Sequence, residues 1–165
     1  MSDLISIRMI EPKDQTWAKN IISEHFGSAL VVSRGKLHDS QTLPAILAIR
    51  GNERIGLLHY HIENRQCEIV TIISLNTGEG IGRKLLETVK AIARKADCER
   101  IWLITTNDNL SAQHFYQHVG GIQVAIFEDA IQKARTLKPE IPEFGENGIP
   151  IRDEIEFEWN LGGKK

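Results

Sequence analysis

Ten residues, Leu75 to Lys84, constrain the fold of this chain most, because three glycines alternate with other residues in them. The apolar run from Ile69 to Ile73 before them predicts a buried strand. Apolar residues after them recur at helical spacing: Leu85, Leu86, Val89, Ile92 and Ala93. The sequence therefore predicts a strand, a glycine turn and a helix in direct succession.

A turn of this composition favours an anion. Gly78, Gly80 and Gly82 remove side chains, so that the backbone can approach a ligand closely. The free N–H groups and the dipole at the start of the following helix both attract negative charge, and phosphate suits such a site best. Arg83 and Lys84 add formal positive charge. An ordinary glycine-rich connection remains the alternative.

Two better-known phosphate loops do not fit. A dinucleotide-binding fingerprint needs a further glycine three residues after its second one, where this chain has Arg83 or Leu85, depending on the starting glycine. A Walker A loop needs Gly-Lys followed by Ser or Thr, and Gly82 is followed by Arg83. The turn therefore belongs to neither class.

Length and net charge limit the possible domain organisation and binding partners of the chain. We expect residues 1–165 to form a single domain. The net charge of -2 gives no general attraction to nucleic acid or to an acidic membrane, and no apolar run is long enough to span a bilayer. The first ten residues are not typical of a secretory signal, and Cys67 and Cys98 suit reduced thiols. We therefore expect a cytoplasmic protein.

Hydrophobic periodicity predicts a mixed α/β chain. Residues 45–50, 54–63 and 66–74 read as three antiparallel strands joined by short turns. Segments 33–43 and 138–150 read as loops, the second a candidate flap. Trp17 and Phe26 share an apolar helical stripe and are expected in the core. Glu154, Glu156 and Glu158 alternate with apolar residues and predict a strand with one solvated face.

Two histidine pairs bear on metal binding. His59 and His61 share one face of a predicted strand, and His114 and His118 are one helical turn apart. Neither pair comes with an obvious set of carboxylates or cysteines, so we expect no metal.

With these elements in order, the chain resembles the Gcn5-related N-acetyltransferase (GNAT) family over nearly its whole length. The acetyl-coenzyme A loop of that family has the form Arg/Gln-x-x-Gly-x-Gly/Ala, which Thr77 to Gly82 matches at Gly80 and Gly82. Thr77 stands where Arg or Gln is usual. A second signature, Asn-x-x-Ala-x-x-Phe-Tyr before a glycine turn, is matched by Asn109 to Tyr116.

The resemblance implies an α+β fold with a mixed, mostly antiparallel central sheet of about six to seven strands, flanked by helices. It implies acetyl-coenzyme A as the co-substrate, with the pantetheine arm beside a strand that splays open and the thioester oxygen on an N–H near Ile72 to Ser74. The expected coenzyme-binding residues are Ile72, Ile73, Ser74, Thr77, Gly78, Glu79, Gly80, Ile81, Gly82, Arg83, Lys84, Asn109 and Tyr116.

The resemblance also implies direct attack by an amine on the thioester. Glu68 lies where some family members carry a general base, and Tyr116 is the candidate acid for the departing thiolate. An exposed strand glutamate and a core tyrosine are the structural alternatives. Asn109 is expected to cap the helix that presents Tyr116.

Two alternatives stay open. Thr77 in the coenzyme loop leaves room for a non-catalytic acyl-coenzyme A sensor or interaction domain on the same fold. The acceptor, a small-molecule or peptide amine, is not identified, and a homodimer is one option for the assembly. The leading hypothesis is an amine N-acetyltransferase.

Overall fold

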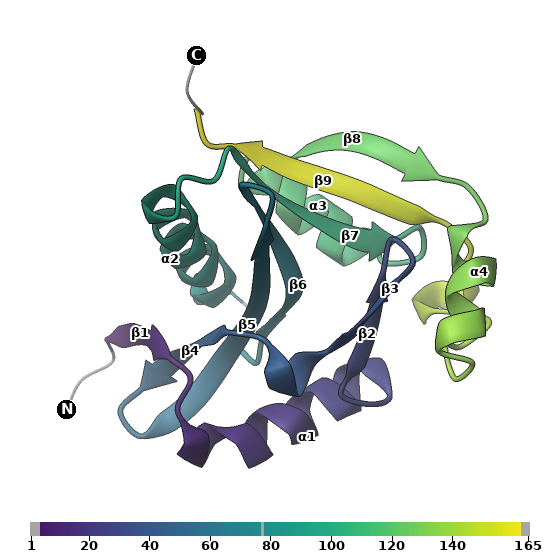
Figure 1. Ribbon diagram of the computed structural model, residues 1–165. Helices are drawn as coiled ribbons and strands as arrows, with labels where there is room; N and C mark the ends of the chain where they lie inside the picture. The colour runs from purple at the N-terminus through teal and green to yellow at the C-terminus, as the bar shows by residue number, and fades with distance from the viewer. Residues whose placement is uncertain (1–3, 77, 163–165) are drawn as a thin grey trace.

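A central sheet of seven strands organises the computed structural model, which describes residues 4–76 and 78–162 (Figure 1). The strands lie in the order β1-β4-β5-β6-β7-β9-β8, and only β6 and β7 are parallel neighbours. Their bounds are β1 Ile5–Met9, β4 Ala45–Arg50, β5 Glu53–Glu63, β6 Gln66–Ser74, β7 Arg100–Thr106, β8 Ile122–Phe127 and β9 Glu154–Asn160. The mixed, mostly antiparallel sheet expected from the sequence is confirmed.

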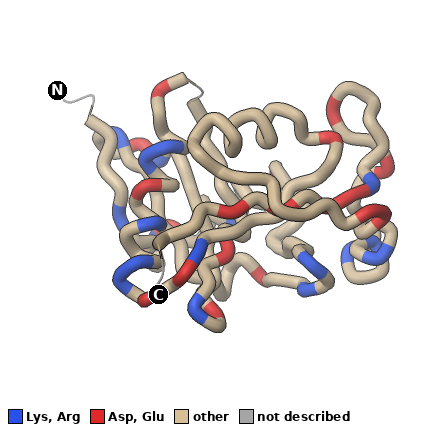
Figure 2. The backbone as a smooth tube through the Cα atoms, turned by 90° about the horizontal axis from the view of Figure 1, so that it is seen from above, with Lys and Arg blue, Asp and Glu red and all other residues tan. Residues whose placement is uncertain are grey.

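Helices cover both faces of this sheet (Figure 1). On one face lie α2, Ile81–Lys95, and α3, Leu110–His118. On the other lie α1, Gln15–Phe26, and a two-stranded hairpin of β2, Leu30–Ser33, and β3, Lys36–Asp39. The last helix, α4, Ala130–Leu137, packs beside β2. Acidic and basic residues are interspersed along the chain in the view of Figure 2, in keeping with its small net charge.

The sheet separates two apolar cores because side chains alternate along a strand. On β4, Ile46 and Ala48 pack with α2 and α3, whereas Ala45 and Leu47 pack with α1. The apolar stripe of α2 packs into the first core, with Ile81, Leu85, Leu86, Val89 and Ala93 buried and Ile92 partly buried. The two cores hold β5 and β6 rigidly between helices, which fixes the strand that precedes the glycine turn.

The N-terminal helix follows the sequence expectation except at its end. Pro12 opens a short 3₁₀ turn, Pro12–Asp14, before α1, and Trp17 packs partly against the second core. Phe26 was expected in the core, but it is 38% exposed. It sits in the last turn of α1, beyond the edge of the sheet, and instead lines a cavity described below.

The prediction of a loop over residues 33–43 is wrong. The segment contains the end of β2, all of β3 and a short 3₁₀ turn, Ser40–Thr42. Arg34 and Gly35, both with positive φ, form the tight turn that joins the two strands. The sequence did not indicate β3 because its side chains are mostly polar: three of its four residues are exposed and only His38 is buried.

The expectation of a solvated acidic face on β9 is also wrong. Glu154 is 2% exposed and pairs with Arg34 of the hairpin turn at 3.0 Å. Glu156 and Glu158 both accept hydrogen bonds from Arg100 Nη1, at 2.6 and 2.8 Å. Because β9 lies inside the sheet, neighbouring cations cover the face that periodicity alone assigned to solvent.

The parallel strands β6 and β7 separate early. They pair only from Gln66 opposite Arg100 to Glu68 opposite Trp102. One residue later β6 contains a bulge: Ile69 and Thr71 pair with consecutive residues of β5, which leaves Val70 without a partner there. The expected splay beside the last residues of β6 is therefore present, and it begins directly after Glu68.

Candidate active site

The glycine turn has the geometry of an anion site at the start of α2. Gly78 and Gly80 have positive φ, +81° and +76°, and Gly80 is the N-cap residue of the helix. The first intrahelical bond runs from Lys84 N–H to the Gly80 carbonyl at 3.0 Å, so the N–H groups of residues 81–83 precede it. Thr77 lies outside the described residues. These amides, which have no intrahelical partner, are those expected to bind phosphate.

The charged side chains around this turn include one ion pair and two exposed cations. The guanidinium of Arg50, at the end of β4, pairs with the carboxylate of Glu79. Arg83 and Lys84 are exposed on the first turn of α2. The sequence expectation included the last two cations but missed Arg50, because it comes from a strand almost thirty positions earlier.

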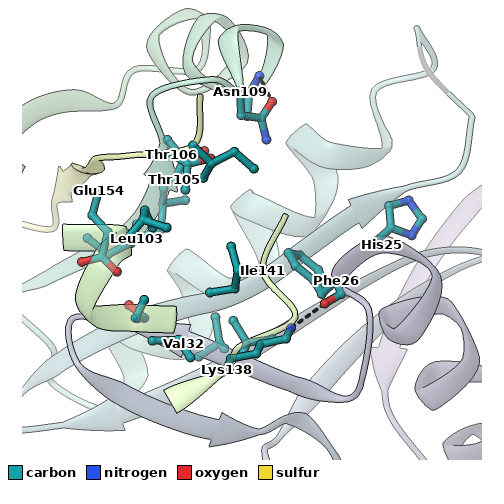
Figure 3. A pocket seen from close by; sticks show the side chains of 18 of the residues that line it. His25, Phe26, Val32, Leu103, Thr105, Thr106, Asn109, Lys138, Ile141 and Glu154 are labelled. Carbon is teal, nitrogen blue, oxygen red and sulfur yellow. Dashed lines mark hydrogen bonds between the residues drawn. The ribbon is translucent and has the colours of Figure 1, made fainter. Parts of the chain in front are cut away.

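A cavity of about 620 Å³ passes through the opening between β6 and β7. It joins the two faces of the sheet, since its walls include α3 on one side and the β2–β3 hairpin with the end of α1 on the other. The lining residues include Glu68, Ile69, Val70 and Ile72 from β6, Leu103 to Thr106 from β7, Asn109, Ala112 and Tyr116 from α3, and Phe26, Val31, Val32, Ser33, Lys138, Ile141 and Glu154 from the far side (Figure 3).

Four of the expected site residues meet in this cavity: Glu68, Ile72, Asn109 and Tyr116. The described residues of the glycine turn do not line it. The side chain of Ile73 is buried in the α1-side core, and the Ser74 hydroxyl donates to the Asn76 carbonyl at 3.2 Å. Of Ile73 and Ser74, the backbone is therefore the part available to a ligand along the strand.

Tyr116 reaches the cavity from α3. Its ring packs against Phe157 and Trp159, with centroid distances of 5.7 and 6.0 Å. Burial raises the pKa of its phenol to about 12, so the hydroxyl is protonated at neutral pH. Asn109 caps the same helix, as expected: its side-chain oxygen accepts from Ala112 N–H at 3.2 Å.

Glu68 is a buried carboxylate rather than an exposed strand glutamate. Only 6% of its side chain is exposed, and its Oε1 lies 3.4 Å from His38 Nε2 of β3. Its Oε2 is buried and has no hydrogen-bond partner among the described residues. Glu68 also borders a second cavity of about 210 Å³, so it stands between two hollows.

Lys138 closes the far side of the main cavity. Its ammonium donates to the Leu30 carbonyl at 2.6 Å and also to the carbonyl of Phe26, which joins the end of α4 to β2 and to the end of α1 (Figure 3). Burial lowers the pKa of Lys138. Lys138 begins the segment 138–150, which was expected to be a loop and a candidate flap, and no local pattern distinguishes such a buried lysine from an exposed one.

Sequence reasoning missed His38, Ser33, Lys138 and Glu154 as cavity residues or their neighbours. The available signal was the Arg34-Gly35 pair, a turn type that would have placed β2 and β3 as a hairpin. The turn does not predict which face of the sheet the hairpin covers, because that depends on tertiary packing.

Other chemistries were also sought among residues 4–76 and 78–162. No group of three or more His, Cys, Asp or Glu side chains is arranged there to hold a metal ion. Cys67 and Cys98 are buried free thiols, and burial raises the pKa of Cys67 to about 12, opposite to the shift that activates a nucleophilic thiol. Within the same residues, every helix is too short or too polar to cross a membrane.

The chain has close relatives in sequence. It is 42% identical to the uncharacterized protein YdhI of Bacillus subtilis over 139 residues, which cover 84% of this chain and 87% of that one. It is 37% identical to YxbD of the same organism over 145 residues, covering 87% and 90%.

Solved structures share the fold. An IAA acetyltransferase from Bacillus cereus superposes with a TM-score of 0.68 at 22% identity, covering 95% of this chain and 99% of that one. A Bacillus subtilis acetyltransferase in complex with CoA gives 0.68 at 21%, with the same coverage. A GNAT family acetyltransferase from Elizabethkingia anophelis with acetyl-CoA bound gives 0.67 at 21%, covering 96% and 99%.

The family assignment rests on the sequence match together with this fold. The profile of the acetyltransferase (GNAT) family matches residues 15–121, which include α1, strands β4 to β7 of the sheet, the glycine turn and α3. This chain is a member of the GNAT acetyltransferase family, and hence an acyltransferase.

Proposed function

We propose that this chain is a single-domain enzyme that transfers the acetyl group of acetyl-coenzyme A to a primary amine by direct attack. One observation carries the proposal: the cavity through the sheet has Tyr116 on its α3 side and Glu68 on its hairpin side, at the point where β6 and β7 part. Two substrates that enter from opposite faces would meet there.

The coenzyme binds on the α2–α3 side in this proposal. Its pyrophosphate accepts hydrogen bonds from the amides that open α2, aided by the helix dipole. The pantetheine arm extends from there along the unpaired edge of β6 toward Asn109. Solved GNAT structures that hold CoA or acetyl-CoA share the fold. The backbone N–H groups of Ile72 to Ser74 are the candidates to stabilise the thioester oxygen as it gains charge.

The acceptor binds on the hairpin side. An alkyl amine is protonated in water, with a pKa near 10, and must lose a proton before it attacks. Glu68 takes that proton, directly or through a water molecule, and the free amine forms the new C–N bond as the C–S bond breaks. Tyr116, protonated at neutral pH, gives its hydroxyl proton to the departing thiolate. The nitrogen loses its second proton to solvent as the amide forms, and the tyrosine regains its proton from solvent.

The cavity wall favours a cationic acceptor. Glu24, Glu68, Glu140 and Glu154 bring four carboxylates to it, against the single ammonium of Lys138. Glu154 is neutralised by Arg34, and Lys138 is held by two carbonyls, so the remaining field is negative. A small amine with a net positive charge fits this wall better than an anionic amino acid.

The test is an acetyl-coenzyme A assay with purified protein and a panel of polyamines, aminoglycosides, amino acids and peptides. Acetylated product, detected by mass spectrometry, and matching thiol release for at least one amine are expected. Glu68→Gln should lower turnover, with little change in coenzyme affinity. Tight coenzyme binding without acetylation of any amine would instead support the sensor alternative.

A further inference from the structure

The search for additional chemistry leads to a buried pair beside the main cavity, Glu68 and His38. Both side chains are almost fully buried, 6% and 2% exposed, and Oε1 of Glu68 lies 3.4 Å from Nε2 of His38. Oε2 of Glu68 and Nε2 of His38 are both buried without a hydrogen-bond partner among the described residues. Buried polar atoms without a partner destabilise the folded state, so these two call for an explanation.

His38 differs in this respect from His59, which is buried as well. Nδ1 of His59 lies 2.8 Å from the Thr71 hydroxyl, which satisfies it. His38 instead presents its Nε2 to a carboxylate at a distance slightly longer than a normal hydrogen bond. A shift of a few tenths of an ångström would complete the contact, and catalytic contacts commonly tighten when substrate binds.

The pair leads to a second, smaller cavity. This hollow of about 210 Å³ lies on the hairpin side and is bordered by Glu68, Ser33 and His61, among others. The rings of His38 and His61 meet edge to face with centroids 5.7 Å apart. Nε2 of His61 lies 3.2 Å from the exposed carboxylate of Glu63. A chain of ionisable groups thus runs from the buried Glu68 to the surface.

We propose that His38 relays the acceptor's proton from Glu68 toward the hairpin surface, an inference that rests on the proposed function. The first transfer breaks an N–H bond of the substrate ammonium and forms the O–H bond of protonated Glu68, leaving a lone pair on the amine nitrogen. The second moves that proton to Nε2 of His38, which restores the carboxylate. The imidazolium then loses one proton to solvent on the hairpin side, which restores the neutral ring with Nε2 free for the next turnover.

The relay answers a geometric problem. The acceptor occupies the main cavity when Glu68 is protonated, so the proton leaves on the other side of Glu68, toward the hairpin and the second cavity. Among the described residues, the side of Glu68 that faces β3 offers a nitrogen base within 3.4 Å. His38 is thus a positioning and proton-transfer residue that acts through Glu68 and does not touch the acetyl group.

Other charges surround the pair and bear on any pH profile. The hairpin contributes Arg34 and Lys36, β5 contributes His61 and Glu63, and β9 contributes Glu154. Arg34 is paired with Glu154, and Lys36 and His61 both face Glu63. Glu68 is the carboxylate nearest to His38 among the described residues. Because several other ionisable groups lie near the pair, chemical rescue is a sharper test of the relay than a pH profile alone.

The experiment compares the wild-type enzyme with His38→Ala, using the best amine from the panel. We expect turnover to fall about 10- to 100-fold at neutral pH, less than for loss of the base itself, while coenzyme affinity by calorimetry is unchanged. Added imidazole, which fits the vacated space, should restore much of the rate. In a series of substituted imidazoles, rescue should rise with the pKa of the added base.

Three controls separate a relay from a structural role. Acetylated amine, not thiol, is measured, because imidazole itself can attack a thioester. Glu68→Gln should be slow and insensitive to imidazole. His114→Ala, on the exposed face of α3, should match the wild type. His38→Gln, close in size, replaces His38→Ala if thermal unfolding shows that the alanine variant does not fold, and its slow turnover should then be independent of buffer concentration.

The outcomes distinguish this inference from the proposed function. If the wild-type protein acetylates no amine, the proposed function fails. If the wild type is active but His38→Ala keeps its rate, or loses rate without any rescue by imidazole, the relay is wrong and the acetyltransferase assignment stands.

Discussion

The Gly82 backbone at the start of α2 packs directly against the ring of Phe115 on α3. A Cβ atom added at residue 82 would lie 2.9 Å from Cζ of Phe115. The family glycine at this position is therefore required for helix packing as well as for an open turn. This contact holds the start of α2, the proposed phosphate-binding end, next to the helix that presents Tyr116.

Gly82→Ala should reduce stability and coenzyme affinity together. The added methyl group overpacks the junction of α2 and α3, at a cost of about 1–3 kcal/mol. Thermal unfolding and calorimetry with coenzyme A measure the two effects. The double variant Gly82→Ala, Phe115→Leu makes room for the methyl group and should recover stability; no recovery would mean that the Phe115 contact is not the cause.

Gly80→Ala should act by a different route. Nothing lies within 4 Å of a Cβ at this position, but φ is +76°, a conformation that costs an alanine about 1–2 kcal/mol. The turn would relax and its amides would lose their alignment, so coenzyme affinity should fall. Gly80→Asn is the matched control, since asparagine tolerates this conformation better and should bind the coenzyme more tightly than the alanine variant does.

Tyr116→Phe should lower kcat about 100-fold and leave the coenzyme dissociation constant nearly unchanged. The phenol pKa of about 12 keeps the hydroxyl protonated, so the wild-type rate should show no loss from ionisation of this acid up to about pH 10. Tyr60→Phe, in the same core but outside the cavity, is the control and should retain activity. Equal turnover in Tyr116→Phe would refute the assigned role.

Asp14 should make folding sensitive to acid. It is fully buried, and Arg8 at 2.7 Å and Arg54 at 2.9 Å hold its pKa well below the ordinary 3.8. The unfolded chain then binds more protons than the native state at low pH, so this stabilisation is complete above about pH 5 and is lost as the pH falls below about 4.

Asp14→Asn should therefore cost about 3 kcal/mol of unfolding free energy at pH 7 and much less at pH 3. Urea denaturation at both pH values measures this difference. Glu87→Gln removes an exposed ion pair with Lys90 and should change stability by less than about 0.5 kcal/mol at either pH. A pH-independent loss in Asp14→Asn would contradict the linkage.

Lys138→Met should loosen the acceptor side of the cavity. The substitution removes two charge-assisted hydrogen bonds to the carbonyls of Phe26 and Leu30, each contributing about 1.5–3 kcal/mol. We expect a lower Tm and a higher KM for the amine, with unchanged coenzyme affinity. Lys133→Met, exposed on the same helix, is the control. A rise in the KM for the coenzyme alone would contradict the placement of Lys138 on the proposed acceptor side of the cavity.

Local pattern predicted the parts of the site that lie close together in the chain. The glycine turn, its strand and its helix follow within thirty residues, and the Asn109 cap and Tyr116 lie on one short helix. Their spacing is enough to predict the glycine turn and the helix that brings Tyr116 to the cavity. Thr77 stays a prediction, since it lies outside the described residues.

The acceptor half could not be predicted in this way. His38 comes from a hairpin thirty residues before Glu68, Glu154 from a strand more than eighty residues after it, and Lys138 from the end of α4. Each is polar and was assigned to a loop or to a solvated face. Hydrophobic periodicity identifies the buried face of a strand or helix only when that face is apolar. Burial of these residues depends on partners that are distant in sequence.

The sequence by itself determined most of the strands and helices, the glycine turn and the family, since these depend on short-range spacing and backbone preference. Only the tertiary structure decided that β6 and β7 part directly after Glu68, that the hairpin covers this point, and that His38 and Glu68 meet there. The physical reason is that a buried polar contact is set by the relative placement of whole elements, which the packing of two separate cores fixes.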